Sequence, residues 1–504
     1  MSTGLTIGLD CGLTVTKAVI FDETGRPKTI ASARVGQQSP EPRWVERDVD
    51  ELWEAGARAI REALKKADVE GADVVGVGVT AHGDGLYLVD AHGKPTRPGI
   101  LSLDTRAHQV VERWEEDGTS AKALEVTGQA PYPASPAAIL AWLVEYEPDV
   151  VERSSWALAC KDVIKQRLTG EVSADPTEAS TSFTDPQTQE YSEAAVEVYG
   201  LGDQGGLLAP IVGCCEVAGT VTDEAAAQTG LAAGTPVVSG LHDVDASAVG
   251  IGCFEPGQMA LIAGTFCINE VIGAKPIKDE RWLARNFVGK GRWQHMSLSP
   301  ASAGNLEWYV GKLSPVEYER AEEAGVDPFG FVEPEIAQIE NDDSRILFFP
   351  FLYGSPHGAA PSGTFVGIRG WHERGHMLRA VLEGVVFNHR THVDWLRESF
   401  EVSEARLTGG ATRSKRWSQM FADCLDLPVV LTDAAEAGAL GAAMCAMVGA
   451  GVHDSLAAAQ EACVRITDRL EPEAEGHRRM DEAYGRYQCV LEQLAPVWRE
   501  LNDE

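Results

Sequence analysis

The sequence of 504 residues contains no uninterrupted apolar run of the roughly 20 residues that a membrane-spanning helix needs. Its ten cysteines include no CxxC pair and no cysteine and histidine cluster with metal-ligand spacing, so we expect reduced thiols. Positive charge is scarce, because 43 lysine and arginine residues stand against 76 aspartate and glutamate residues. Nucleic acids and anionic membranes need a basic surface, so a net charge of −33 argues against both as partners.

The first ten residues also lack the basic segment that precedes the apolar part of a secretory signal, so we expect a cytoplasmic protein. The chain is longer than one hydrophobic core usually supports, which predicts two domains. The alternation of predicted strands and helices favours an α/β fold. We place the domain boundary near residue 238, which gives domains 1–238 and 239–504.

This boundary depends on two predicted β-hairpins that occupy corresponding places in the two halves. The first covers residues 5–22 and turns around Gly12, and the second covers 259–268 and turns at Gly264 and Thr265. The two hairpins correspond in their predicted structure, although their amino-acid sequences do not align. It predicts a duplicated fold.

Further segments show clear helix or strand patterns. Apolar residues recur at helical spacing over residues 50–66, and 74–79 is a short β-rich run. Ser135 followed by Pro136 indicates the start of a helix, and a helix is expected from about Lys415 to Leu425.

The turn of the first hairpin carries residues that suit phosphate binding. Asp10 offers a carboxylate for magnesium or its water shell, Gly12 and Thr14 offer an amide and a hydroxyl for phosphate oxygens, and Lys17 offers a cation. An ordinary hairpin with an exposed aspartate and lysine is the alternative. Gly264 and Thr265 form a weaker second candidate.

Asp243 follows an apolar strand and a glycine, where a rigid backbone could hold a general base. The alternative is a carboxylate that only caps the helix that follows. Asp245 competes for the role of base, although it falls in the first turn of that helix, where the helix dipole alone favours an acidic residue.

Two more segments could bind ligands. Gly409 and Gly410, with the small residues of 436–443, could line a nucleotide pocket or could serve close helix packing. The loop with His82 and Asp84 combines an imidazole and a carboxylate, which suits hydrogen bonds to neighbouring hydroxyls. No further histidine or cysteine near this loop supports a metal site.

Taken in order, these motifs resemble the FGGY family of carbohydrate kinases over almost the whole chain. The family's fold is a duplicated ribonuclease-H-like unit, shared with actin and hexokinase, with mixed sheets flanked by helices and an interdomain cleft. The matching segments include Trp44 to Asp48, Arg97 to Arg106, Arg167 to Glu171, Thr229 to Pro236, Pro350 to Gly354, and Gly363 to Gly384. The resemblance implies an ATP-dependent kinase that uses Mg²⁺.

The resemblance also implies a role for each candidate residue. It makes Asp243 the catalytic base and a substrate contact, and Asp10 the metal residue. The ATP-binding residues would be Gly12, Thr14, Lys17, Gly264, Thr265, Gly409, Gly410, Ala411, Ser414, Glu436, Gly438 and Ala439. The sugar-binding residues would be His82, Gly83, Asp84, Asp104 and Arg106.

Two positions depart from the family pattern. The usual threonine of the first phosphate segment is Leu13, which removes one hydroxyl contact. The usual asparagine or glutamine after the base is Val244, which removes one polar contact.

The expected substrate is a small sugar or polyol, and a homodimer is compatible with the sequence. Within the family the pattern resembles L-xylulose kinases most, for example in Gly304 to Trp308. The sugar loop instead resembles erythritol kinases, because Asp84 stands where L-xylulose kinases typically carry lysine. We therefore favour a ketopentose over a four- or five-carbon alditol by a small margin, and glycerol less. A sugar sensor or a chaperone-type ATPase on the same fold is the non-kinase alternative.

Overall fold

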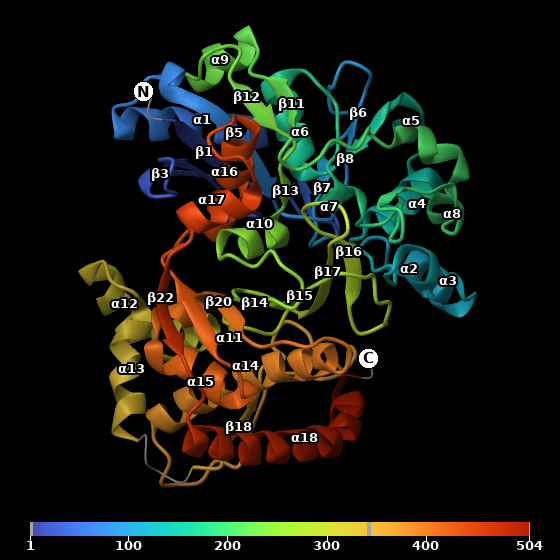
Figure 1. Cartoon of the computed structure of the whole chain (residues 1–504). Coiled ribbons are helices and arrows are strands. Elements are labelled where there is room, and N and C mark those ends of the chain that lie inside the picture. The colour runs from blue at the N-terminus through green and yellow to red at the C-terminus, as the bar shows by residue number, and fades with distance from the viewer. Residues whose placement is uncertain (1–3, 340–343, 503–504) are drawn as a thin grey trace. The chain divides into compact units, whose positions relative to one another are not determined.

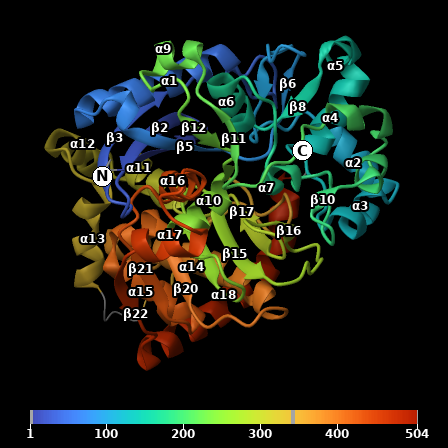
Figure 2. The ribbon, with the colours of Figure 1, turned by 45° about the horizontal axis from the view of Figure 1, so that its top comes forward.

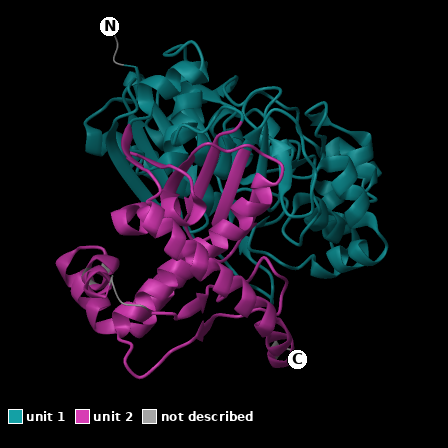
Figure 3. Ribbon diagram, turned by 60° about the horizontal axis from the view of Figure 1, so that its bottom comes forward, with its two compact units in different colours: residues 1–256, 272–295, 433–465 teal, residues 257–271, 296–432, 466–504 magenta. Residues whose placement is uncertain are grey.

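The computed structural model of the chain describes residues 4–339 and 344–502. The chain forms two compact units, and each is assembled from three separate segments (Figure 3). The division predicted at residue 238 stays a prediction. Unit 1 contains Met1–Pro256, Ile272–His295 and Asp433–Arg465, and unit 2 contains Gly257–Val271, Met296–Thr432 and Ile466–Glu504.

Unit 1 is built on a seven-stranded sheet of mixed direction (Figure 1). Six strands have the order β11-β12-β5-β1-β2-β3, and β13 pairs with β5. The first strand pairs antiparallel with β2 and parallel with β5, so the predicted first hairpin is confirmed. The strands are β1 (Leu5–Cys11), β2 (Val15–Phe21), β3 (Pro27–Arg34), β5 (Val74–Ala81), β11 (Val217–Thr220), β12 (Pro236–Val238) and β13 (Leu241–His242).

Helices flank this sheet, and a second group of helices forms a separate core of its own around Trp114, Trp142 and Phe183. The helices next to the sheet include α1 (Val49–Ala67), α6 (Cys160–Thr169), α9 (Asp223–Thr229), α10 (Asp243–Gly250), α16 (Ala437–Gly449) and α17 (Leu456–Cys463). The second group is α2 (His108–Glu116), α3 (Thr119–Thr127), α4 (Pro136–Tyr146), α5 (Pro148–Arg153) and α8 (Glu193–Glu197).

Helices α1 and α16 cover opposite faces of β1, as Figure 2 shows. Successive residues of a strand point to opposite faces. A Cβ atom on Gly56 of α1 would lie 3.8 Å from Leu9, whereas a Cβ atom on Gly8 would lie 1.9 Å from the Ala439 carbonyl oxygen of α16. Only glycine allows this approach, so the small residues of α16 do serve close packing.

Unit 2 repeats the arrangement of the first hairpin. Strand β14 pairs antiparallel with β15 and parallel with β20, and the sheet continues as β15-β14-β20-β21-β22. The predicted second hairpin is therefore confirmed. The strands are β14 (Met259–Ala263), β15 (Cys267–Gly273), β17 (Trp293–Ser299), β18 (Leu347–Phe349), β19 (Thr364–Val366), β20 (Ala405–Gly409), β21 (Val429–Thr432) and β22 (Ile466–Leu470). The end of β15 and the start of β17 belong to the segment Ile272–His295 of unit 1.

The helices of unit 2 include the predicted helix after the glycine turn, which is α15. They are α11 (Gly304–Leu313), α12 (Pro315–Ala324), α13 (Pro328–Gln338), α14 (Arg374–Arg397), α15 (Lys415–Leu425) and α18 (Ala474–Asn502).

The remaining elements are short and belong to unit 1. They are β4 (Glu46–Arg47), β6 (Tyr87–Val89), β7 (Gly99–Ile100), β8 (Trp156–Leu158), α7 (Pro176–Ala179), β9 (Thr184–Asp185), β10 (Glu190–Tyr191) and β16 (Leu283–Asn286). Within residues 4–339 and 344–502, none of the helices combines the length and apolar character that crossing a bilayer requires.

Candidate active site

The turn of the first hairpin brings Asp10 and Lys17 to neighbouring positions of unit 1. They are directly opposite each other in the β1–β2 ladder, and the Gly12 amide donates to the Val15 carbonyl oxygen at 3.1 Å, which closes the turn. The buried Arg47 donates from behind to the carbonyl oxygens of Gly12, at 3.4 Å, and Leu13. The turn is therefore held by a cation that the sequence analysis did not assign.

The first turn of α16 lies against this hairpin. Glu436, which precedes the helix, accepts a hydrogen bond from Lys17 Nζ at 2.7 Å. A Cβ atom on Gly438 would lie 3.2 Å from Asp10 Oδ2. Three of the residues expected at adenosine, namely Glu436, Gly438 and Ala439, therefore lie in unit 1 beside the first phosphate turn.

Asp10 has a perturbed acidity in this position. Burial raises the pKa of its carboxyl to about 6, although the Lys17 cation acts in the opposite direction and the Glu436 carboxylate adds to the rise. A carboxylate near its pKa is readily stabilised in ionised form by an added cation.

Asp243 is the first residue of α10 and directly follows β13. Its side chain is 41% exposed, so it can be reached by a ligand. The pKa of Asp243 is raised to about 7. Desolvation by the surrounding protein is the main cause, the Asp10 and Asp84 carboxylates add to it, and hydrogen bonds from the Val244 and Gly83 amides act in the opposite direction. A base with a pKa near 7 suits proton transfer at neutral pH.

Asp245 lies in the first turn of α10, as predicted, but faces the interior. Its side chain is only 3% exposed, and its Oδ2 lies 3.8 Å from His242 Nδ1. Burial raises the pKa of Asp245 well above its ordinary value, and the Asp175 carboxylate adds to the effect. Asp243 is thus the more accessible of the two candidate bases.

The sugar loop places Asp84 in an ion pair. Asp84 has a left-handed backbone with φ 57°, and its Oδ1 accepts a hydrogen bond from Arg285 Nη2 at 2.9 Å. Arg285 Nη2 also donates to Tyr132 Oη at 3.0 Å, and Nε donates to Gln129 Oε1 at 2.9 Å. Burial acts to raise the pKa of Asp84, but the Arg285 cation, His242 and the hydrogen bonds from Tyr132 and Arg285 together lower it below its ordinary value. Asp84 is therefore ionised and already partly satisfied.

His82 is turned toward the protein interior. It is buried, and its Nε2 lies 3.2 Å from Tyr87 Oη. Burial and, to a smaller extent, the Arg47 cation lower the pKa of His82 to about 3, so the imidazole is neutral. Gly83 lies against another histidine, because a Cβ atom there would lie 1.6 Å from His242 Nε2. This glycine cannot be replaced without displacing His242.

Asp104 and Arg106 are bound chiefly to each other. The Asp104 carboxylate accepts from the Arg106 side chain at 2.8 and 2.9 Å and from the Val45 amide at 2.6 Å. Arg106 also donates to Glu46 Oε1 at 2.8 Å and stacks over Trp44 at 4.0 Å. Both side chains are buried, so these contacts show a structural use of the pair. A contact of either residue with a sugar stays a prediction.

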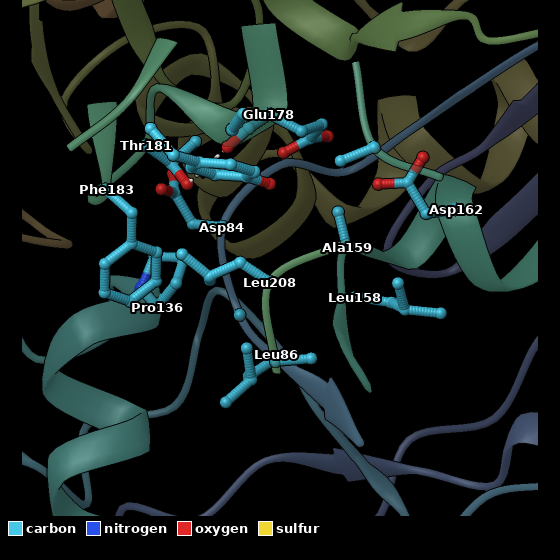
Figure 4. A pocket seen from close by; sticks show the side chains of 15 residues that line it. Asp84, Leu86, Pro136, Leu158, Ala159, Asp162, Glu178, Thr181, Phe183 and Leu208 are labelled. Atoms are coloured by element: carbon cyan, nitrogen blue, oxygen red, sulfur yellow. Dashed lines mark hydrogen bonds between the residues drawn. The ribbon is translucent and has the colours of Figure 1, made fainter. Parts of the chain in front are cut away.

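A small cavity lies next to Asp84 within unit 1. Its volume is about 40 Å³, and Figure 4 shows Asp84, Glu178 and Thr181 gathered toward one end and Leu86 at the other. A water molecule needs at least about 10–15 Å³ measured in this way, so the cavity has room for a few waters and not for a sugar.

In unit 2, the ends of β14 and β20 bring the two glycine turns together. Ala263 and Gly409 are direct partners in the parallel ladder, and a Cβ atom on Gly409, whose φ is 92°, would lie 2.6 Å from the Ala263 carbonyl oxygen. The space beside Gly264 is open, since a Cβ atom there would meet no atom within 4 Å. Thr265 is exposed. This corner can admit a ligand close to the backbone.

Ser414 and Ala411 lie at the start of α15 in unit 2. The Ser414 hydroxyl accepts from the Trp417 amide at 3.2 Å and donates to Glu333, so it caps the helix. Ala411 is fully buried. The cap satisfies a backbone amide that the helix would otherwise leave without a partner.

The acidic residues fit magnesium better than a transition metal. The described part of the chain contains no group of three or more histidine, cysteine, aspartate or glutamate side chains that could enclose a metal ion. Magnesium is commonly held by one or two carboxylates together with water and substrate phosphates. Asp10, which lies beside Gly438 and close enough to Asp243 to raise its pKa, is the residue predicted to supply such a ligand.

Arg285 is the main residue of this region that the sequence analysis missed. It lies in β16, 201 residues from Asp84 and 43 from His242. The local sequence gives one hint of its importance: Arg285 is a charged residue in a short strand that contains few other charged residues. The contact itself depends on tertiary packing.

Comparisons with known proteins agree on one family. The model of the FGGY family of carbohydrate kinases matches in its N-terminal domain over residues 5–250 and in its C-terminal domain over 259–450. The chain is 34% identical to the L-xylulose/3-keto-L-gulonate kinase of Escherichia coli, over 97% of each chain. It is 33% identical to a protein of Pasteurella multocida named as a probable L-xylulose kinase, over 97% of this chain and 98% of the other.

The solved structures agree with this result. The crystal structure of a xylulose kinase from Rhodospirillum rubrum superposes with a TM-score of 0.87 and 27% identity, and covers 98% of this chain and 100% of that one. The predicted two-domain fold of the actin and hexokinase type is therefore confirmed.

Proposed function

Since the chain belongs to the FGGY family of carbohydrate kinases, we propose that it transfers the terminal phosphoryl group of ATP to a hydroxyl of a ketopentose, with L-xylulose as the first candidate. The predicted class of enzyme, a sugar kinase, is confirmed by the family and by its relatives. The particular substrate, the magnesium ion and the role of each residue are parts of the proposal.

The position of Asp243 is the observation that supports this function most. A sugar hydroxyl is a poor nucleophile at neutral pH, and a carboxylate within hydrogen-bonding distance can orient it and accept its proton. Asp243 is accessible, has a pKa of about 7, and stands at the rigid junction of β13 and α10. As the proton passes to Asp243, the hydroxyl oxygen bonds to phosphorus and the bond to the ADP oxygen breaks.

The phosphate and metal roles are proposed for the residues around the two hairpin turns. Asp10 would hold Mg²⁺, whose charge would offset that of the phosphates, and Gly12, Thr14 and Lys17 would bind phosphate oxygens. Within unit 2, Gly264, Thr265, Gly409, Gly410, Ala411 and Ser414 would serve the nucleotide. The open space beside Gly264 supports this assignment.

Glu436, Gly438 and Ala439 were expected at adenosine. We propose instead that Glu436 holds Lys17 in place, because Glu436 accepts a hydrogen bond from Lys17 Nζ at 2.7 Å. Gly438 leaves Asp10 Oδ2 uncovered, since a Cβ atom there would lie 3.2 Å away.

Two observations support a ketopentose over an alditol. The relatives from Escherichia coli and Pasteurella multocida are named for L-xylulose. The reason to weigh an alditol was the carboxylate of Asp84 in the sugar loop, and Arg285 donates to this carboxylate at 2.9 Å. We propose that Asp84 contacts the sugar with the acceptor capacity that this pair leaves.

ADP release with a panel of sugars tests the proposal. The purified chain is given Mg-ATP with L-xylulose, D-xylulose, 3-keto-L-gulonate, erythritol, glycerol or no sugar. We expect sugar-dependent ADP release that is greatest with a ketopentose. Release with an alditol alone would replace the ketopentose, and the absence of sugar-dependent release would favour a sensor or a chaperone-type ATPase.

A further inference from the structure

A continuous series of side-chain contacts runs from the sugar loop to the candidate base. Asp84 Oδ1 lies 2.9 Å from Arg285 Nη2, and Arg285 Nη1 lies 3.5 Å from His242 Nε2. On the other side of the imidazole, His242 Nδ1 lies 3.2 Å from Asp243 Oδ1. All four residues belong to unit 1. The carboxylate of the loop is thus connected to the carboxylate of the base through two intervening side chains.

Arg285 is placed to orient its neighbours and not to bind a ligand. Its side chain is 2% exposed. Its Nε donates to Gln129, and its Nη2 donates to Asp84 and to Tyr132. A guanidinium has five N–H groups, and three of them are therefore used within the protein before Nη1 meets His242. The cation is fixed on three sides.

The position of Arg285 determines which nitrogen of His242 carries the proton. A guanidinium can only donate, so Nε2 must accept, and in a neutral imidazole the proton then resides on Nδ1. Nδ1 lies 3.2 Å from Asp243 Oδ1, which is an acceptor for that proton. The Val244 amide points at Nδ1 from 3.4 Å and can donate to it only when Nδ1 carries no proton, whereas the Asp243 carboxylate accepts from the same amide in either tautomer.

Two further observations agree with a fixed, neutral imidazole. Burial and then the Arg285 cation lower the pKa of His242 to about 4. The ring packs closely against the loop, because a Cβ atom added to Gly83 would lie only 1.6 Å from Nε2. The His242 amide in turn donates to the Thr177 hydroxyl at 2.9 Å, which fixes the backbone.

We propose that His242 and Arg285 are positioning residues that hold the Asp243 carboxylate through its Oδ1 and so leave Oδ2 to face the acceptor hydroxyl. The proposal rests on the proposed function in one respect, namely that Asp243 is the base. It adds that the orientation of the base depends on the same cation that fixes Asp84, so that the sugar loop and the base are set by one group.

Two substitutions of His242 separate positioning from mere packing. His242→Asn keeps an amide donor where Nδ1 stands, whereas His242→Gln places its amide near Nε2 and leaves Asp243 without the donor. Misplacement of a reacting group by about 1 Å can cost about 10²-fold in rate, so we expect kcat of His242→Gln to fall by about that factor. His242→Asn should retain kcat within about tenfold. The KM values for sugar and ATP should stay near those of the wild type in both.

Both variants fill less space than histidine. If His242 had only a packing role, kcat should fall by a similar factor in both variants, or by more in the variant with the smaller asparagine. Equal kcat values for the two variants, with both folded by thermal unfolding, would overturn the proposal. A rise in the KM of the sugar without any fall in kcat would also overturn the proposal.

A second measurement does not need turnover. In protein labelled with ¹⁵N-histidine, the ring of His242, assigned by its loss in His242→Asn, should report the Nδ1–H tautomer at neutral pH. Arg285→Lys, which keeps the charge but changes the geometry of the donor, should shift that signal. The Nε2–H tautomer in the wild type would overturn the proposal even if the sugar kinase activity is found. The Nδ1–H tautomer in a chain without that activity would retain the contacts and refute the proposed function alone.

Discussion

Lys17 Nζ lies 2.7 Å from Glu436 Oε2, although 419 residues separate the two in the sequence. The contact joins the first hairpin to the start of α16, whose close packing on β1 requires Gly8. Both side chains are partly exposed, so the pair adds little to stability. Its consequence is to fix the cation of the phosphate turn.

The first prediction concerns this cation. Lys17→Met should raise the KM for ATP by about tenfold, since the loss of one favourable charge interaction of about 1.4 kcal/mol is a factor of ten. The KM for the sugar should remain unchanged. Glu436→Gln is the matched variant, and it should change the KM for ATP less, because Lys17 is kept. A comparable rise in the KM for the sugar in Lys17→Met would contradict the assignment of Lys17 to phosphate.

The second prediction concerns the pH dependence of activity. The base must be ionised, so kcat/KM for the sugar should fall as pH drops below about 7, the pKa of Asp243. The Asp10 carboxylate raises that pKa in the metal-free protein, so Asp10→Asn should move the acidic limb of sugar binding, measured without Mg²⁺ and nucleotide, to lower pH.

Asp10→Asn should also weaken use of Mg-ATP while sugar binding without nucleotide is preserved. Profiles of sugar binding against pH for the wild type and for Asp10→Asn, both without Mg²⁺ and nucleotide, provide the check. An acidic limb that stays in place would show that Asp10 does not act on the base, and a loss of sugar affinity would show that Asp10 contacts the sugar.

The third prediction concerns stability. The pKa of Asp243 in the folded protein, about 7, lies above its ordinary value of 3.8, so the folded state binds more protons than the unfolded state between these values. Stability is therefore lost as pH rises through this window, and Asp243→Asn removes that loss. We expect Asp243→Asn to unfold at a higher temperature than the wild type at pH 8 and to differ little at pH 4.

Thermal unfolding at both pH values measures this difference. Glu152→Gln, at an exposed position, is the control for a general effect of removing negative charge. The prediction fails if Asp243→Asn is no more stable than the wild type at pH 8, or if the control rises equally.

The fourth prediction concerns the packing of α16 on β1. A Cβ atom on Gly8 would lie 1.9 Å from the Ala439 carbonyl oxygen, so Gly8→Ala forces the helix away from the strand. Overpacking of a core costs about 1–3 kcal/mol, and we expect a loss of stability in the upper part of this range or beyond it. Gly205→Ala, where a Cβ atom would meet nothing within 4 Å, should be close to neutral. Equal stability of the two variants by chemical denaturation would contradict the close approach.

Local patterns predicted the elements that carry the candidate site. The alternation around Gly12 and Gly264 predicted both hairpins, and the ladders confirm them. The run that ends at Asp243 predicted a strand followed by a helix, and Asp245 lies in the first turn of that helix as expected. These features depend on residues close in sequence, which is why the sequence alone carries them.

The contacts around those elements could not be predicted, because they join distant segments. Arg285 meets Asp84 across 201 residues, and no periodicity links the two positions. The same holds for Arg47, which binds the carbonyl oxygens of the first turn from β4. The resemblance to the family supplied roles for single residues, but not the partners that set their charge. Asp84 was therefore expected at the sugar without any sign that Arg285 donates to one of its oxygens.

The central claim is that Asp243, and not Asp245, is the general base of a sugar kinase. The two residues are two positions apart in the sequence, yet the side chain of Asp243 is 41% exposed and that of Asp245 is 3% exposed. Replacement by asparagine keeps the size of the side chain and removes its basicity. The two asparagine variants therefore test which carboxylate accepts the proton, with little change in the shape of the site.

The most direct measurement is kcat of Asp243→Asn beside that of Asp245→Asn, with the sugar that gives the greatest ADP release and with sugar titrations that show both variants to be folded. General base catalysis contributes about 10²–10⁴-fold, so we predict that kcat of Asp243→Asn falls by a factor in this range with sugar affinity preserved. Asp245→Asn should lose far less. The reverse order, or a wild-type kcat in Asp243→Asn, would contradict the account.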